Sequence, residues 1–152
     1  MEIKLKKTDH NIVVIGSSAT GKTTIANKLA KKFPGYKVYH TDDYLQHGFK
    51  ESLYVMRKDL AFDISPKKII EGVQGVRLLR KGLEHNDFFA DVIIVCDCTM
   101  QKRINRYKKR NELHKLPHLT GFDKMLGMIF KDYLDKLAVH PSKRPRILTV
   151  TT

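Results

Sequence analysis

The sequence predicts an α/β domain, a three-layer sandwich in which a five-stranded parallel sheet carries helices on both faces. Short apolar runs alternate along the chain with segments whose apolar residues recur at helical spacing, which is typical of strand–helix–strand units. The apolar runs are continuous, as expected of strands covered on both faces. A glycine-rich loop joins the first run to the first helix. We expect a single domain over residues 1–152.

The expected strands are short. The first and fourth, at residues 12–15 and 92–95, contain only isoleucine and valine. The second and third, at residues 38–40 and 68–70, are followed by acidic residues, Asp42 and Asp43 after Thr41 in one case and Glu71 in the other. The fifth is expected at residues 147–150. Because open parallel sheets place their ligands at the carboxyl ends of the strands, these acidic residues are candidate site residues.

Five helices are expected. The first runs from about Lys22 to Phe33, has its apolar side chains on one stripe and ends at Pro34-Gly35. The last runs from about Phe122 to Ala138. The other three are expected at residues 53–62, 74–83 and 100–111. Residues 112–120 include Pro117 and are expected to form a loop.

Composition narrows the class of partner. A net charge of +13 favours polyanions, namely nucleotides, nucleic acid or an anionic surface. No apolar run approaches the ~20 residues that span a bilayer, so no membrane partner is expected. Cys96 and Cys98 are too few for a disulfide framework or a structural zinc site, and free thiols indicate a cytoplasmic location. The sequence leaves the oligomeric state open.

The glycine-rich loop is a phosphate-binding loop, or Walker A motif. It consists of Gly16, Ser17, Ser18, Ala19, Thr20, Gly21, Lys22, Thr23 and Thr24. The two glycines allow successive N–H groups to turn around a phosphate. Lys22 can reach the β- and γ-phosphates, and the Thr23 hydroxyl can ligate Mg²⁺. The loop therefore predicts a nucleoside triphosphate and Mg²⁺ as ligands.

Three classes of protein use such a loop: GTPase switches, mechanical ATPases and small-molecule kinases. A guanine-binding Asn-Lys-x-Asp motif is missing, because residues 27–30 read Asn-Lys-Leu-Ala. An Asp-x-x-Gly switch motif is missing too, and the chain is short for a mechanical ATPase. Small-molecule kinases remain.

Four segments, in this order, resemble the uridine kinase and nucleoside kinase branch of the P-loop kinases. They are the phosphate-binding loop, Thr41-Asp42-Asp43-Tyr44, Ile70-Glu71-Gly72, and the arginine series Arg103, Arg106 and Arg110. The resemblance extends from residue 12 to about residue 111. It implies ATP-dependent transfer of the γ-phosphoryl group to a hydroxyl of a small acceptor, a nucleoside or a related metabolite, with Mg²⁺.

The resemblance also implies roles for the acidic residues. Asp42 stands where the family keeps its catalytic carboxylate, which can accept the acceptor's proton and help to place Mg²⁺. Side chains alternate along an extended backbone, so we expect Asp42 rather than Asp43 to face the phosphates. Glu71 can bind Mg²⁺ through water or hold an acceptor hydroxyl. The structural alternatives are a helix-capping Asp42 and a surface Glu71.

Residues 101–110 hold six basic side chains in ten. On a helix, five of them share one face: Lys102, Arg103, Arg106, Lys109 and Arg110. Such a face suits a lid, at about residues 100–120, that closes over a triphosphate. The resemblance implies that Arg103 and Arg106 are catalytic and that Arg110 binds the nucleotide. The alternative is a solvated basic face or a nucleic-acid patch.

The acceptor is the least determined part of the prediction. Candidate lining residues are Tyr44, Tyr54, Arg57 and Tyr107, although ordinary half-buried positions are the better interpretation of Tyr54 and Arg57. Asp43 and Glu71 are only about twenty-eight residues apart, which leaves little chain for an acceptor-binding hairpin. The acceptor is therefore expected to be small, or the site to be open.

Two other functions stay open. Asp42-Asp43-Tyr44 also resembles the 5′-hydroxyl polynucleotide kinases, and the basic charge suits a nucleic-acid acceptor. That family expects an arginine shortly after the acidic pair, where this chain has Leu45-Gln46-His47. The third function is a non-catalytic nucleotide-binding module that acts through partners, against which the intact Lys22, Thr23, Asp42 and Glu71 argue.

Overall fold

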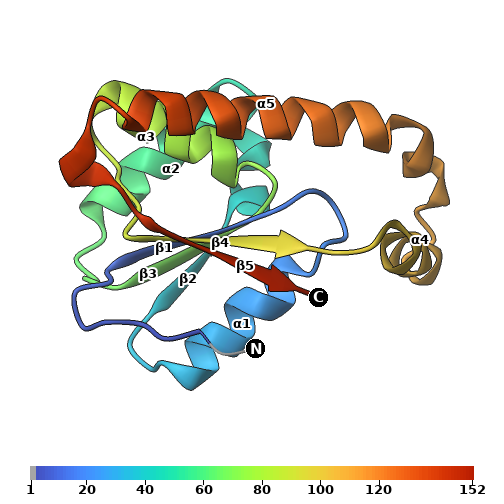
Figure 1. Ribbon diagram of the computed structural model, residues 1–152, viewed down its shortest axis with the longest axis horizontal. Helices are drawn as coiled ribbons and strands as arrows, with labels where there is room; N and C mark the ends of the chain where they lie inside the picture. The colour runs from blue at the N-terminus through green and yellow to red at the C-terminus, as the bar shows by residue number, and fades with distance from the viewer. Residues whose placement is uncertain (1–2) are drawn as a thin grey trace.

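Five parallel strands form one sheet in the order β2-β3-β1-β4-β5, which confirms the predicted fold class (Figure 1). The computed structural model describes residues 3–152, apart from the side chain of Pro141. The strands are β1 (Asn11–Ile15), β2 (Lys37–His40), β3 (Lys68–Glu71), β4 (Val92–Asp97) and β5 (Arg146–Thr151). Because β1 lies between β3 and β4, the loop after β1 emerges beside the carboxyl ends of both neighbours.

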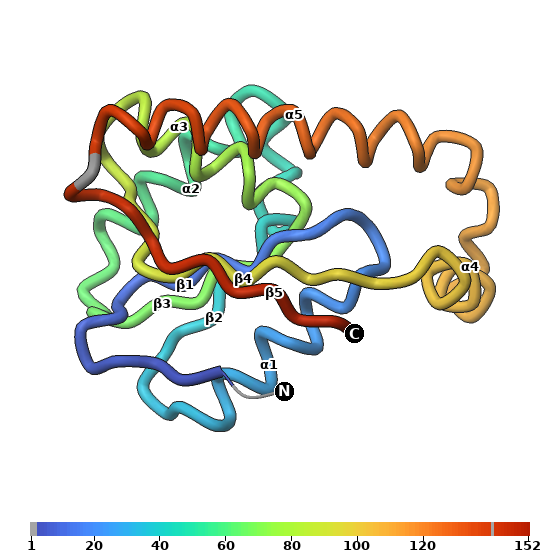
Figure 2. The backbone as a smooth tube through the Cα atoms, in the orientation of Figure 1, coloured from blue at the N-terminus to red at the C-terminus, as the bar shows by residue number. Residues whose placement is uncertain are grey.

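Helices cover both faces of the sheet. In Figure 1, α1 (Lys22–Lys32) lies below the sheet, and α2 (Glu51–Phe62), α3 (Gly75–His85) and α5 (Leu119–Leu137) lie above it. Figure 2 shows α4 (Met100–Lys109) beyond the carboxyl end of β4, at the end of the sheet. Short 3₁₀ helices are η1 (Thr41–His47), η2 (Leu113–His118) and η3 (Pro141–Lys143).

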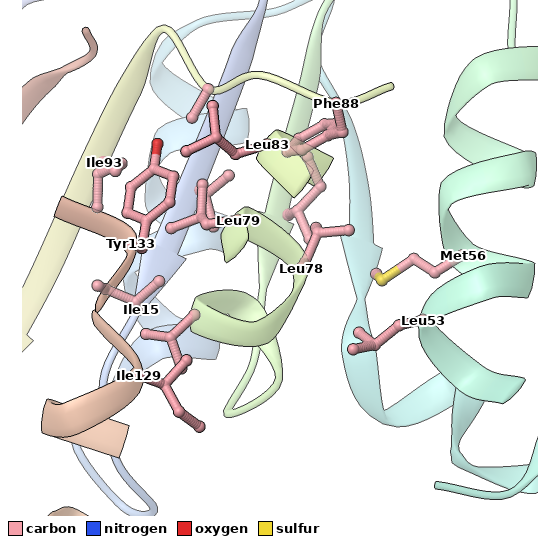
Figure 3. Close-up of a cluster of buried hydrophobic side chains, with 14 of the residues drawn as sticks. Ile15, Leu53, Met56, Leu78, Leu79, Leu83, Phe88, Ile93, Ile129 and Tyr133 are labelled. Carbon is pink, nitrogen blue, oxygen red and sulfur yellow. The ribbon is translucent and has the colours of Figure 1, made fainter. Parts of the chain in front are cut away.

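The side chains of the central strands pack into two separate hydrophobic cores. Val13 of β1 packs with α2, α3 and α5, whereas Ile12 and Val14 pack with α1. Figure 3 shows the larger core, in which Leu79 of α3 and Ile129 of α5 lie close to the sheet. All five of these side chains are buried, and each contributes about 1.5–3 kcal/mol of transfer free energy. Both cores hold the carboxyl edge of the sheet in place.

The segment expected to be a loop, residues 112–120, is largely helical. It contains η2, and α5 begins at Leu119 rather than at about Phe122. Leu119 is buried with Tyr107 of α4 and Ala19 of the phosphate-binding loop, and Leu116 packs against them. This small cluster joins the predicted lid to the loop. Its contacts span about a hundred residues of sequence, so no local periodicity reveals them.

No helix within residues 3–152 has both the length and the apolar composition needed to cross a bilayer. β5 also differs from the central strands. Its side chains alternate between half-buried and exposed, because it lies at the edge of the sheet.

Candidate active site at the phosphate-binding loop

The loop between β1 and α1 has the backbone of an anion-binding turn. Ala19 and Gly21 have φ angles of 62° and 90°, in the left-handed region, and such residues turn successive N–H groups to one side. A Cβ at Gly16 would lie 2.5 Å from Thr20 Oγ1 and 3.1 Å from the Cys96 carbonyl oxygen. Gly21 precedes α1, so the positive end of that helix faces the same space.

Lys22 lies within the turn. Its Nζ donates a hydrogen bond to the Ser17 carbonyl at 2.6 Å, and its side chain is buried. Burial lowers the pKa of Lys22 to about 8, against the opposing effect of the nearby carboxylates of Glu71 and Asp42. Within residues 3–152 it forms no ion pair at contact distance. The ammonium group is therefore available to an anion that enters the loop.

Glu71 connects the loop with the neighbouring strands. Its Oε2 accepts a hydrogen bond from the Thr23 hydroxyl at 3.2 Å, and its Oε1 lies 2.6 Å from His40 Nδ1. Strand register produces this arrangement, because Glu71 pairs with Val14 of β1 on one side and with His40 of β2 on the other. The sequence pattern marks His40 only as a strand-end residue and does not reveal this contact.

These oxygens fit a magnesium ion. Mg²⁺ in kinases is held by one or two carboxylates together with substrate phosphate oxygens. Glu71 and Thr23 are in contact, and Asp42 lines the same pocket. The predicted ligands Thr23, Asp42 and Glu71 all line this pocket and are the residues that would hold the ion.

The pocket itself has a volume of about 140 Å³. It is lined by Ser18, Ala19, Gly21, Lys22, Thr23, Thr24, Asp42, Glu71, Gly72, Val73 and Arg110. Asp42 contributes to its wall, and the adjacent Asp43 does not. Residues from four separate parts of the chain thus meet where a γ-phosphate would lie.

A close approach between two loops shapes the wall of this pocket. Gly72, which follows β3, has a φ of 139°, and a Cβ there would lie 1.8 Å from Thr41 Oγ1. Thr41 is buried at the start of η1, directly before Asp42. The absence of a side chain at residue 72 thus lets the segment that carries Asp42 approach β3.

The three predicted lid arginines have different surroundings. Arg103 is buried, and its guanidinium donates to the Ser18 carbonyl at 3.0 Å and to Asp123 of α5. Arg106 donates to the Ala19 carbonyl at 2.8 Å and lies 3.0 Å from Cys98 Sγ. Arg110 is exposed at the end of α4 and lines the pocket.

A second, larger pocket of about 640 Å³ adjoins the first. The two share Gly21, Thr24 and Arg110. The larger pocket is otherwise walled by Ile25, Lys28, Arg106, Lys109, Val150, Thr151 and Thr152. Its position between α1, α4 and β5 and its size suit the nucleoside part of a triphosphate whose phosphates lie in the loop.

Asp123 is a site residue that sequence reasoning missed. It accepts a hydrogen bond from the Ser17 hydroxyl and is ion-paired with Arg103. Burial raises its pKa, but the hydrogen bonds from Arg103 and Ser17 outweigh burial and lower it. Asp123 lies in the second turn of a helix, far along the chain from the loop, so no motif identifies it.

The candidate acceptor residues are dispersed. Arg57 is buried and pairs with Asp87 at 3.0 Å, and Tyr54 is largely exposed. Tyr107 of α4 is buried in the cluster with Ala19 and Leu119. Tyr44 packs partly against the larger core, and burial raises its pKa above the usual range. None of these four side chains lines the pocket at the loop.

Comparison with known proteins identifies the fold. No protein-family model and no curated protein matches the sequence. A shikimate kinase from Acinetobacter baumannii, solved with shikimate, is 15% identical with a TM-score of 0.63, over 96% of this chain and 85% of that chain. A putative kinase from Chloroflexus aurantiacus is 19% identical with a TM-score of 0.57, over 96% and 89%. A thymidylate kinase from Candida albicans is 15% identical with a TM-score of 0.56, over 95% and 84%. The chain therefore has the fold of the P-loop kinases.

Proposed function

We propose that this protein is an ATP-dependent kinase that transfers the γ-phosphoryl group to a hydroxyl of a small acceptor. The observation that carries the proposal is the convergence of Lys22, Thr23, Asp42 and Glu71 on one pocket beneath a phosphate-binding loop. ATP is favoured over GTP because the guanine-binding motif is missing. The structural neighbours include kinases of small molecules, which supports the same class of reaction.

Each of these four residues has a separate role in the proposed phosphoryl transfer. Asp42 accepts the proton of the acceptor hydroxyl while the hydroxyl oxygen attacks the γ-phosphorus. The bond between the γ-phosphorus and the oxygen that bridges it to the β-phosphate breaks at the same time. Lys22 and the loop N–H groups stabilise the charge that develops on the transferring group and on the leaving ADP. Mg²⁺ bound near Thr23 and Glu71 would supply further charge neutralisation. Glu71 also keeps the Thr23 hydroxyl oriented.

The lid arginines take different parts in this proposal. Arg110 lines both pockets and binds the triphosphate, and Arg106 contributes its positive charge from the wall of the larger pocket. Arg103, predicted to be catalytic, contacts the Ser18 carbonyl and Asp123. We assign Arg103 to holding the loop in its binding conformation.

The proposal includes two finer statements. The uridine kinase-like branch is proposed from the four resembling segments. A cytoplasmic location is proposed because both cysteines are free and because burial raises the pKa of the Cys96 thiol to about 11, which keeps it unreactive.

A coupled kinase assay against a panel of acceptors tests the proposal. The panel covers nucleosides, nucleotides, sugars, vitamins and 5′-hydroxyl oligonucleotides. Lys22→Ala should lose nearly all transfer, because Lys22 stabilises charge on the moving group. Lys31→Ala is the matched control, because Lys31 is an exposed lysine at the far end of the same helix. Equal activity in the two variants would refute the proposed kinase activity.

The polynucleotide kinase alternative is favoured by the charge of +13, in addition to the resemblance of Asp42-Asp43-Tyr44. If the lid arginines form a nucleic-acid patch, the slope of log K for oligonucleotide binding against log salt concentration should fall by about one for each arginine removed. Arg103→Ala, Arg106→Ala and Arg110→Ala are therefore compared for oligonucleotide binding at two salt concentrations and for turnover with small acceptors. Steep salt dependence that weakens in all three variants, without small-acceptor turnover in the wild type, would establish this alternative. Nucleotide binding without any turnover would establish the non-catalytic module.

A further inference from the structure

Arg77, in the first turn of α3, has a guanidinium group with no acidic partner within residues 3–152. Four other arginines form ion pairs with aspartates: Arg57, Arg80, Arg103 and Arg146. The Arg77 guanidinium carbon lies 3.9 Å from the centroid of the Phe49 ring, and Nη2 lies 3.8 Å from Met125 Sδ. Its Nε is buried and has no hydrogen-bond partner among the described residues.

The neighbours of Arg77 come from segments that also reach the phosphate-binding site. α3 begins at Gly75, two residues after Val73, which lines the phosphate pocket together with Glu71 and Gly72. Phe49 follows η1, the segment that carries Asp42. Met125 follows Asp123, which is hydrogen-bonded to Ser17 of the loop. The larger pocket for the nucleoside lies between α1, α4 and β5 instead, so η1, α3 and α5 frame the opposite side.

The surroundings of Arg77 are unfavourable for an isolated cation. Arg77 is half-buried. The part of its guanidinium that is withdrawn from water costs free energy unless a partner compensates it, and a sulfur atom and an aromatic face compensate only partly. Burial, together with the charge of Arg80, lowers the pKa of Arg77. A partner anion would recover this cost.

The geometry also limits the kind of partner. Phe49 covers one flat face of the guanidinium, so the remaining N–H donors point outward in the plane of the group. Two such parallel donors match the two oxygens of a carboxylate or a phosphate. A neutral hydroxyl or a nucleobase carbonyl offers no matching charge.

We propose that Arg77 binds an anionic group of the acceptor, so that the acceptor is a hydroxyl-bearing carboxylic acid or phosphate monoester rather than a neutral alcohol. This inference rests on the proposed kinase function, and it replaces the neutral nucleoside that the uridine kinase-like branch implies as acceptor with an anionic one. A carboxylate and a phosphate monoester share the chemistry that Arg77 recognises. The arms of the experiment separate the two sources.

The test measures binding to the protein saturated with Mg²⁺ and the non-hydrolysable analogue AMP-PNP, which fills the phosphate-binding loop. Calorimetric titrations use malate for the carboxylate arm, glycerol 3-phosphate for the phosphate arm and glycerol as the neutral reference. At least one anion should bind the wild type more tightly than glycerol. Arg77→Met should weaken that binding by about tenfold or more, as expected for the loss of charge-assisted hydrogen bonds.

Arg80→Gln is the matched control, because Arg80 is one turn further along α3 and its charge is paired with Asp132 at 3.5 Å. It should change anion binding by less than about twofold, because its charge is paired with Asp132 and screened by solvent. Equal weakening in Arg77→Met and Arg80→Gln, or no preference of the wild type for either anion, would overturn the proposal.

A folding control accompanies these titrations. The uncharged side chain introduced by Arg77→Met would occupy the apolar space between Phe49 and Met125, so the variant should keep or raise Tm. Arg77→Lys keeps the charge but loses the planar donor pair, and its anion affinity should lie between those of the wild type and Arg77→Met. If Arg77→Met fails to fold, wild-type affinity in Arg77→Lys would refute the assignment of a bidentate site.

The inference and the proposed function fail in different ways. Absence of transfer to every acceptor would refute the kinase, whereas the anion titrations need no turnover. Transfer to neutral acceptors with the same KM in wild type and Arg77→Met would refute the anion site and leave the kinase standing.

Discussion

Arg103 and Asp123 form a bidentate ion pair, with Nη1–Oδ2 and Nη2–Oδ1 distances of 2.7 and 3.1 Å. Each partner also contacts the phosphate-binding loop, Arg103 through the Ser18 carbonyl and Asp123 through the Ser17 hydroxyl. The pair therefore connects α4, α5 and the loop. The hydrogen bonds that Arg103 donates to Asp123 raise the pKa of Arg103 above its usual value, so the cation is retained at every physiological pH.

This pair should contribute to stability. Arg103→Ala is expected to lower the free energy of unfolding by about 2–3 kcal/mol, because it leaves the partly buried Asp123 without its partner. Arg110→Ala, which removes an exposed arginine without an ion pair in the described chain, should change it by less than about 0.5 kcal/mol. Urea unfolding measures both. In the Arg103→Ala/Asp123→Ala double variant the losses should not add, and full additivity would show that the contact is not energetically coupled.

The two adjacent aspartates should differ in catalysis. Asp42→Asn should lower kcat by ~10²-fold or more, the usual contribution of a positioned general base. Asp43→Asn should have a smaller effect, because only Asp42 lines the pocket. Steady-state kinetics with a turned-over acceptor decide between them. The reverse order would assign the base to Asp43.

Nucleotide affinity should depend on pH through Lys22. Its pKa of about 8 in the free protein means that the ammonium form predominates at neutral pH and is lost as pH rises through 8. The triphosphate prefers the charged form, so its Kd should increase between pH 8 and 9.5, by up to about tenfold per pH unit. Titration of Mg²⁺–AMP-PNP at several pH values measures this slope. Lys22→Met should abolish it, and a slope that persists in the variant would point to another group.

Gly72 should tolerate no side chain. In Gly72→Ala the new Cβ would meet Thr41 Oγ1 in a backbone conformation that L-residues rarely adopt, so we expect a loss of more than about 2 kcal/mol of stability. Gly127→Ala is the control, because it lies within α5 with nothing within 4 Å of the new Cβ. That change should stabilise the protein by about 0.5–1 kcal/mol. Thermal unfolding compares the two, and equal Tm values would contradict the close approach.

The secondary structure was largely predictable because its signals are local. Runs such as residues 12–15 and 92–95 are apolar without interruption, and they form β1 and β4 in the centre of the sheet. Residues 41–47 and 113–118 are 3₁₀ helices without a clear period, and neither was predicted from the sequence. Leu116 and Leu119 pack against Tyr107 and Ala19, and such contacts leave no periodic trace.

The sequence by itself determined the phosphate-binding loop, because its glycines, lysine and threonine act within nine consecutive residues. It also placed Asp42 and Glu71 at strand ends, which a parallel sheet brings to one edge. Only the tertiary structure decided how the basic face of α4 is used. A helical period puts Arg103, Arg106 and Arg110 on one face of α4. In the structure, Arg103 pairs with Asp123 of α5, and both Arg103 and Arg106 donate to carbonyl groups of the phosphate-binding loop. Only Arg110 lines the phosphate pocket. The packing of distant elements, which no local pattern encodes, also placed Asp123 beside Ser17 and Phe49 over Arg77.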